Sequence, residues 1–116
     1  MIKDVLRGNL QFDGVVITDD MTMGGITKNY DIGKAAIQSV RAGTDIVLVG
    51  HNYNQQIAVL QALKRSVDEG QLTEQMLDEH VYRILKLKSK YKLKDTATGS
   101  MDVQAINKEI SSALAD

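Results

Sequence analysis

Two short apolar runs rich in β-branched residues constrain the fold of this chain more than any other feature. Residues 14–18 read Gly-Val-Val-Ile-Thr, and residues 45–50 read Asp-Ile-Val-Leu-Val-Gly. Neither run alternates apolar with polar side chains, which is typical of parallel strands that are buried on both faces. We therefore predict two parallel strands in an α/β fold.

Amphipathic helix patterns surround the two runs. The helix expected between them ends near Gly43, which makes a strand–helix–strand unit of about 36 residues, the size of a right-handed crossover. Further helical patterns occupy residues 2–10, 57–67, 74–85 and 103–114, with Thr73 placed to cap the third of these. The apolar positions that mark these helices are Ile32, Ala35, Ala36 and Val40, then Ile57, Leu60, Leu63 and Val67, then Leu77, Val81, Ile84 and Leu85, and finally Val103, Ile106, Ile110 and Leu114. The helix at residues 74–85 is expected to bury its four apolar positions.

The number of strands is too small for a complete sheet. Two strands that are apolar on both faces need neighbours on both edges, so we expect the chain to be part of a larger α/β structure. In isolation it would expose strand edges and apolar surface, which favours self-association or partial disorder. Small residues at 96–100 indicate a linker, which divides the chain into residues 1–95 and a C-terminal helix within 96–116.

Composition excludes several classes of protein. The 116 residues are 43% hydrophobic and 25% charged, and the net charge of −1 offers no basic surface for nucleic acid. No apolar run approaches the roughly 20 residues that span a bilayer. There is no cysteine, and neither a nucleotide-binding glycine motif nor a serine-hydrolase motif occurs. We predict no cofactor and no metal, since His51 and His80 are not accompanied by clustered carboxylates.

An acidic pair, Asp19 and Asp20, follows the first apolar run. In parallel α/β folds ligands bind at the carboxyl ends of the strands, so a functional carboxylate is expected here. Consecutive strand residues point to opposite faces. We therefore expect one carboxylate to enter the site and the other to hydrogen-bond the following loop.

Other residues near these strand ends are weaker candidates. Met21 and Met23 could line a pocket wall, although buried packing is the common role of methionine. His51 follows the second run at its carboxyl end and could contact a ligand, although a loop histidine bonded to backbone fits equally. Asp45 lies at the amino end of its run, which favours a loop or cap role, and His80 is interpreted as a helix-face residue.

Residues 10–26, which read LQFDGVVITDDMTMGGI, resemble the nucleophile segment of family 3 glycoside hydrolases, most of all the β-N-acetylhexosaminidase branch. Residues 42–49, AGTDIVLV, are similar to the next strand of that family. The resemblance extends over residues 5–93 and implies the last two β/α units of a partial (β/α)8 TIM-like barrel, followed by C-terminal helices. It implies that Asp19 is the nucleophile that forms a covalent glycosyl-enzyme with net retention. Met23 and His51 are then candidate substrate-binding residues.

The resemblance also implies what this chain does not carry. In this branch a histidine with a partnering aspartate on an earlier loop acts as acid/base, and a Lys-His segment and an arginine hold the sugar. None of these precedes Met1, so we expect a fragment that is inactive alone, from a parent that hydrolyses terminal β-N-acetylglucosamine in cell-wall muropeptides or chitooligosaccharides. Two alternatives are a receiver-like signalling domain, in which the acidic pair would bind Mg²⁺, and a non-catalytic helical interaction module. The localisation of the parent stays open.

Overall fold

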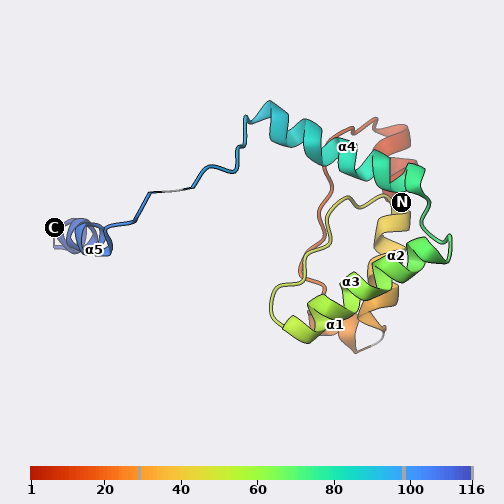
Figure 1. Cartoon of the computed structure of the whole chain (residues 1–116), viewed down its shortest axis with the longest axis horizontal. Helices are drawn as coiled ribbons and strands as arrows, with labels where there is room; N and C mark the ends of the chain where they lie inside the picture. Colours follow the sequence, from red (N-terminus) through yellow and green to blue (C-terminus); the bar gives the residue numbers. More distant parts are fainter. Residues whose placement is uncertain (29, 98, 116) are drawn as a thin grey trace.

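The chain is mostly helical, with two extended segments between its helices (Figure 1). The computed structural model describes residues 1–28, 30–97 and 99–115. The predicted helices are confirmed, and the first is wound as a π-helix. The described elements are η1 (Ile2–Asn9), α1 (Gly24–Thr27), α2 (Ile32–Ala42), α3 (Tyr53–Asp68), α4 (Glu74–Lys90) and α5 (Val103–Leu114).

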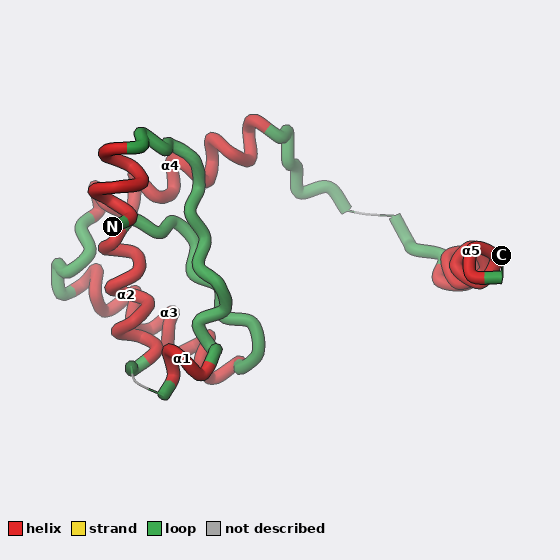
Figure 2. The backbone as a smooth tube through the Cα atoms, turned by 180° about the vertical axis from the view of Figure 1, so that it is seen from behind, coloured by secondary structure: helices red, strands yellow, loops and turns green. Residues whose placement is uncertain are grey.

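The two apolar runs lie side by side and run parallel, as predicted (Figure 2). We call residues 14–18 the first extended segment and residues 45–50 the second. A parallel bridge joins Ile17 to Ile46, and the Thr18 N–H donates to the Ile46 carbonyl at 3.0 Å. Regular strand pairing goes no further than this isolated bridge, so the prediction of two regular strands was wrong.

A side-chain hydroxyl competes with the backbone for hydrogen bonds and so limits the regular pairing of the two segments. The Leu48 N–H donates to the Thr18 hydroxyl at 2.9 Å rather than to a backbone carbonyl, and the Leu48 carbonyl accepts from the Met21 N–H at 3.0 Å. Short polar side chains that bond the backbone in this way compete with regular secondary structure. Within the described residues each segment also has only one extended neighbour, and a pair of strands alone is marginal.

The core lies where α2 and α3 pack against the extended segments. Gly33 allows the two helices to approach closely, because a Cβ at this position would come within 2.7 Å of the Ala62 Cβ. The buried side chains at the centre are Met21, Ile32, Ala36 and Val59, surrounded by Ile26, Ala35, Val47, Val49 and Leu63.

Local sequence signals set the helix ends. The Thr73 hydroxyl accepts from the Met76 N–H at 3.2 Å, which confirms the predicted cap of α4. Gly43 ends α2 in the left-handed region with φ of 112°, where glycine avoids the strain that a Cβ would cause. Asp31 and Asn52 cap α2 and α3 through their side-chain oxygens.

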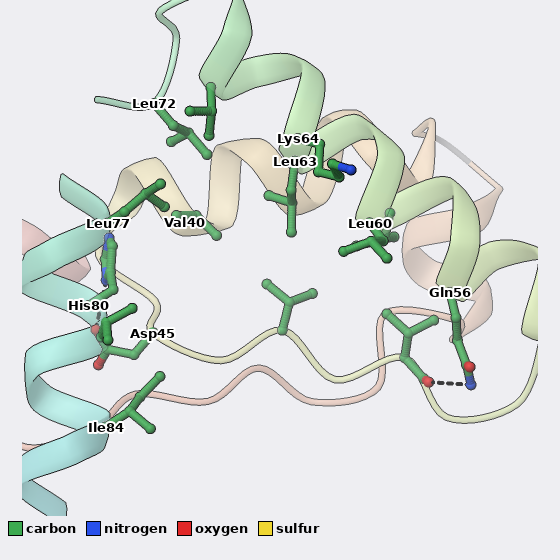
Figure 3. Close-up of a pocket in the computed structure, with 15 residues that line it drawn as sticks. Val40, Asp45, Gln56, Leu60, Leu63, Lys64, Leu72, Leu77, His80 and Ile84 are labelled. Atoms are coloured by element: carbon green, nitrogen blue, oxygen red, sulfur yellow. Dashed lines mark hydrogen bonds and ion pairs between the residues drawn. The ribbon is translucent and has the colours of Figure 1, made fainter. Parts of the chain in front are cut away.

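The predicted burial of Val81 and Leu85 on α4 was wrong. Both are exposed, as is Leu60 on α3, and Leu60 and Val81 line a hollow that no described residue fills. Between these helices and the second extended segment lies an open hollow of about 540 Å³, lined mostly by apolar side chains (Figure 3).

The last helix, α5, stands apart from the other helices at the end of residues 91–102 (Figure 1). The predicted amphipathic helix forms here, and all its apolar residues are exposed. The division into residues 1–95 and 96–116 stays a prediction.

Candidate active site

The carboxyl ends of the two extended segments meet at one edge of the molecule. Because the segments are parallel and adjacent, the acidic pair after the first comes close to His51 after the second. The Gly50 N–H donates to the Asp20 carboxylate at 3.1 Å, so the contact between the two loops is direct. The strand-end location that the sequence indicated for the site is therefore formed by both segments.

The Asp20 carboxylate is occupied by protein donors. Its Oδ1 accepts from the Thr22 N–H at 2.9 Å, from the Thr22 hydroxyl at 2.8 Å and from the Gly50 N–H. Its Oδ2 lies 2.7 Å from the His51 Nδ1, and the side chain is only 13% exposed. The hydrogen bonds from Thr22 and Gly50, followed by that from His51, hold the pKa of Asp20 well below its ordinary range.

This arrangement confirms that one carboxylate of the pair bonds the following loop. It also adds a link that sequence reasoning missed, because Asp20 holds the second extended segment as well. The residues joined are about thirty positions apart in the chain, and nothing in their spacing indicated the contact. Asp20 therefore orients two loops at once.

Asp19 is the member of the pair that stays available. Its side chain is exposed, and its Oδ1 accepts from the Asp20 N–H at 2.8 Å. Among the described residues no hydrogen bond reaches its other oxygen. Asp19 borders an open hollow of about 470 Å³ that Met21 and Ile26 also line, so a carboxylate oxygen can meet a ligand from solvent.

The other predicted site residues have different surroundings. Met21 is buried in the core, whereas Met23 is exposed and its N–H donates to the Asp20 carbonyl at 3.3 Å. Buried packing therefore holds for Met21 and is wrong for Met23. His51 is 86% exposed, and its partner is the Asp20 carboxylate, so the alternative of a backbone-bonded histidine was wrong. No hydrogen bond or ion pair in the described part of the chain joins Asp19 to His51.

A buried charged cluster lies at the opposite, amino end of the second segment. The Asp45 side chain is 0% exposed; its Oδ2 accepts from Arg7 Nη2 at 2.7 Å and from the Val16 N–H at 2.9 Å. Its Oδ1 lies 2.7 Å from His80 Nδ1 and accepts from Arg83 Nε at 2.8 Å. Figure 3 shows His80 and Asp45 pointing toward each other at one end of the hollow.

The expected loop or cap role of Asp45 was therefore wrong, since its carboxylate joins η1, the second segment and α4. His80 does lie on a helix face, but that face is buried. Burial would raise the pKa of Asp45, but the hydrogen bonds from the Val16 N–H, His80 and Arg83 outweigh it and hold that pKa below its ordinary value. Sequence reasoning missed the cluster because Arg7 and Arg83 lie far from Asp45 along the chain.

The described residues contain no group of three or more acidic or histidine side chains able to hold a metal ion. Within the same residues, every helix is too short or too polar to cross a membrane.

Comparisons with known proteins point to one family. Residues 1–87 match the family model described as the glycosyl hydrolase family 3 N terminal domain, a TIM-barrel-type fold. A β-N-acetylglucosaminidase/β-glucosidase of Cellulomonas fimi is 33% identical over 89 residues, which is 77% of this chain and 15% of that protein. A β-hexosaminidase of Bordetella avium is 46% identical over 48 residues, which is 41% of this chain and 14% of that protein.

A solved structure supports the same assignment. The family 3 β-N-acetylglucosaminidase from Paenibacillus sp. str. FPU-7 superposes with a TM-score of 0.81 at 40% identity, over 87% of this chain and 19% of that one. The chain thus spans less than a fifth of the length of these relatives. The match to the family model over most of the chain shows that the protein belongs to glycosyl hydrolase family 3.

Proposed function

We propose that this chain supplies the nucleophile-bearing part of a retaining β-N-acetylhexosaminidase, and that it forms the last two β/α units of a TIM-like barrel. The names of the Paenibacillus, Cellulomonas and Bordetella relatives support this branch of the family. The parallel bridge between the two extended segments is consistent with neighbouring barrel strands. The substrate of the complete enzyme is a terminal β-N-acetylglucosamine in a cell-wall muropeptide or a chitooligosaccharide.

The proposal rests on the different surroundings of the two aspartates in the acidic pair. Both oxygens of Asp20 are engaged by protein donors, whereas Asp19 is exposed beside a hollow. The Asp19 carboxylate attacks the anomeric carbon, the bond to the leaving-group oxygen breaks, and a glycosyl ester forms. Water then hydrolyses the ester with net retention. His51 and Met23 lie in the loops that follow the two extended segments and are proposed to contact the sugar.

The same observation weighs against a receiver-like domain. That alternative needs an acidic pair free to bind Mg²⁺, and the Asp20 oxygens are already taken. No particular contact favours a helical interaction module.

The chain alone is proposed to have no significant hydrolase activity. Its two histidines are engaged by Asp20 and Asp45, and no acid/base is assigned to either. Without proton donation to the leaving group a glycosidase loses a factor of roughly 10² to 10⁴. We propose that the missing groups come from earlier segments of a complete barrel, and that the isolated chain self-associates through its uncovered apolar faces.

The test is reconstitution. The 116-residue chain is mixed with a family 3 N-acetylglucosaminidase truncated just before the region that this chain matches, and hydrolysis of 4-nitrophenyl N-acetylglucosaminide is measured. Neither part alone should be active, and the mixture should be. Asp19→Asn in the chain should lower the reconstituted rate by a factor of about 10³ or more.

The matched control is Asp4→Asn, which removes the same charge from an exposed side chain in η1 and should leave the rate unchanged. A reconstituted rate that survives Asp19→Asn would exclude Asp19 as nucleophile. A robust rate from the chain alone, abolished by Asp19→Ala, would contradict the proposed dependence on missing segments.

A further inference from the structure

The two oxygens of Asp20 have separate partners. Oδ1 accepts all three hydrogen bonds that hold the loops, from the Thr22 N–H, the Thr22 hydroxyl and the Gly50 N–H. Among the described residues, the hydrogen-bond partner of Oδ2 is the imidazole of His51 alone, at 2.7 Å from Nδ1. Loop anchoring and contact with the histidine are therefore carried by different atoms of one carboxylate.

The contact at Oδ2 determines the tautomer of His51. An ionised carboxylate only accepts hydrogen bonds, and the low pKa of Asp20 keeps it ionised. Nδ1 must therefore carry a proton, and in the neutral ring Nε2 is left with its lone pair. Because the side chain is 86% exposed, this acceptor nitrogen is open to solvent at the edge that also carries Asp19.

We propose that Asp20 is a positioning residue that holds His51 as the Nδ1–H tautomer, so that Nε2 accepts a hydrogen bond from a donor group of the bound glycoside. The identity of the ligand rests on the proposed function above. Sugars present several hydroxyl donors, and an N-acetyl sugar adds an amide N–H. A fixed acceptor at the same edge as Asp19 orients such a group without the entropy cost of ordering a free histidine side chain.

Because the two oxygens have separate partners, the variant Asp20→Asn can change the contact with His51 and keep the contacts that hold the loops. With its carbonyl oxygen in the place of Oδ1, the asparagine keeps the acceptor for Thr22 and Gly50. Its NH₂ group then replaces Oδ2 and donates toward Nδ1, which must become the lone-pair nitrogen. The ring proton moves to Nε2, and the open nitrogen changes from acceptor to donor while the loops stay anchored.

Nitrogen-15 NMR of the full chain, labelled in histidine and recorded at alkaline pH, measures this directly. Wild type should give the Nδ1–H tautomer at His51, and Asp20→Asn should give the Nε2–H tautomer. Assignment comes from the signal lost in His51→Gln, and unchanged His80 signals show that the fold is retained. Asp4→Asn should leave the wild-type tautomer. An Nε2–H tautomer in wild type, or the same tautomer in Asp20→Asn, would overturn the proposal.

Titration of the labelled chain in its reconstituted complex with the truncated enzyme, using methyl β-N-acetylglucosaminide and methyl β-glucoside, tests the ligand, because the chain alone lacks the groups expected to hold the sugar. If a sugar hydroxyl is the donor, both glycosides should shift the His51 Nε2 signal. If the amide N–H is the donor, only the N-acetylglucosaminide should shift it. The shift should be lost in Asp20→Asn. No shift with either sugar up to its solubility would refute the role of Nε2 in binding. The tautomer of His51 does not depend on Asp19. If the Asp19→Asn test in the reconstituted enzyme fails, the tautomer result still holds, so the two proposals can fail separately.

Discussion

The buried cluster around Asp45 offers the sharpest test of what holds this chain together, through the variant Asp45→Asn. The carboxylate receives four donors on two oxygens, and an asparagine of the same shape keeps one acceptor oxygen. The Val16 N–H belongs to the backbone and cannot turn away, so the remaining oxygen should stay with Val16 and Arg7. The new NH₂ group then faces His80 and Arg83.

The size of the effect follows from these contacts. His80 can offer its lone pair to the NH₂ group, so the main loss is the hydrogen bond from Arg83, and a bond to a charged group contributes about 1.5–3 kcal/mol. The two guanidinium groups also lose the charge that compensated them. Removing one partner of a buried ion pair costs about 3–5 kcal/mol. Arg7 and Arg83 are 14% and 17% exposed and can reach water, so we expect a loss of about 3 kcal/mol.

Urea unfolding of the full chain, followed by circular dichroism, checks this value. With an m-value of about 2 kcal/mol/M, the midpoint should fall by about 1.5 M. Asp13→Asn is the matched control, because it removes the same charge from an exposed pair with Lys86 and should not move the midpoint measurably. If Asp45→Asn shifts the midpoint no more than Asp13→Asn does, the cluster does not fasten η1 and α4 to the second segment.

Three further predictions concern the same fold. Stability should fall in acid, because the pKa of Asp45 is lower in the folded than in the unfolded chain. The contribution of the Asp45 carboxylate to stability is complete above about pH 3.9 and is lost as the pH falls through the pKa of the folded chain. A series of urea midpoints at different pH should show this loss in wild type and much less of it in Asp45→Asn. Gly43→Ala should destabilise the chain by at least about 1 kcal/mol, because φ is positive and the new Cβ would lie 3.1 Å from Ile2; an unchanged thermal midpoint would contradict this. Light scattering should detect oligomers that Leu85→Lys reduces, since Leu85 is exposed; a monodisperse wild-type monomer would refute the proposed self-association.

Much of the local structure could be read from the sequence because its causes are local. The spacing of Ile32, Ala36 and Val40, the left-handed position of Gly43 and the hydroxyl of Thr73 act within a few residues of themselves. The pattern around Asp19 and Asp20 likewise indicated the family and the end of the molecule at which we propose the site. The expectation that one aspartate would anchor the loop needed only the alternation of strand side chains.

Contacts between distant residues could not be read in this way. The helices, the order of the two apolar runs and the acidic pair after the first run follow from the order of residues alone. The contact of Asp20 with His51, the contacts of Asp45 with Arg7 and Arg83, and the exposure of Val81 became visible only in three dimensions. Hydrogen bonds and burial depend on which groups meet in space, whereas helix periodicity and capping depend only on near neighbours in the chain.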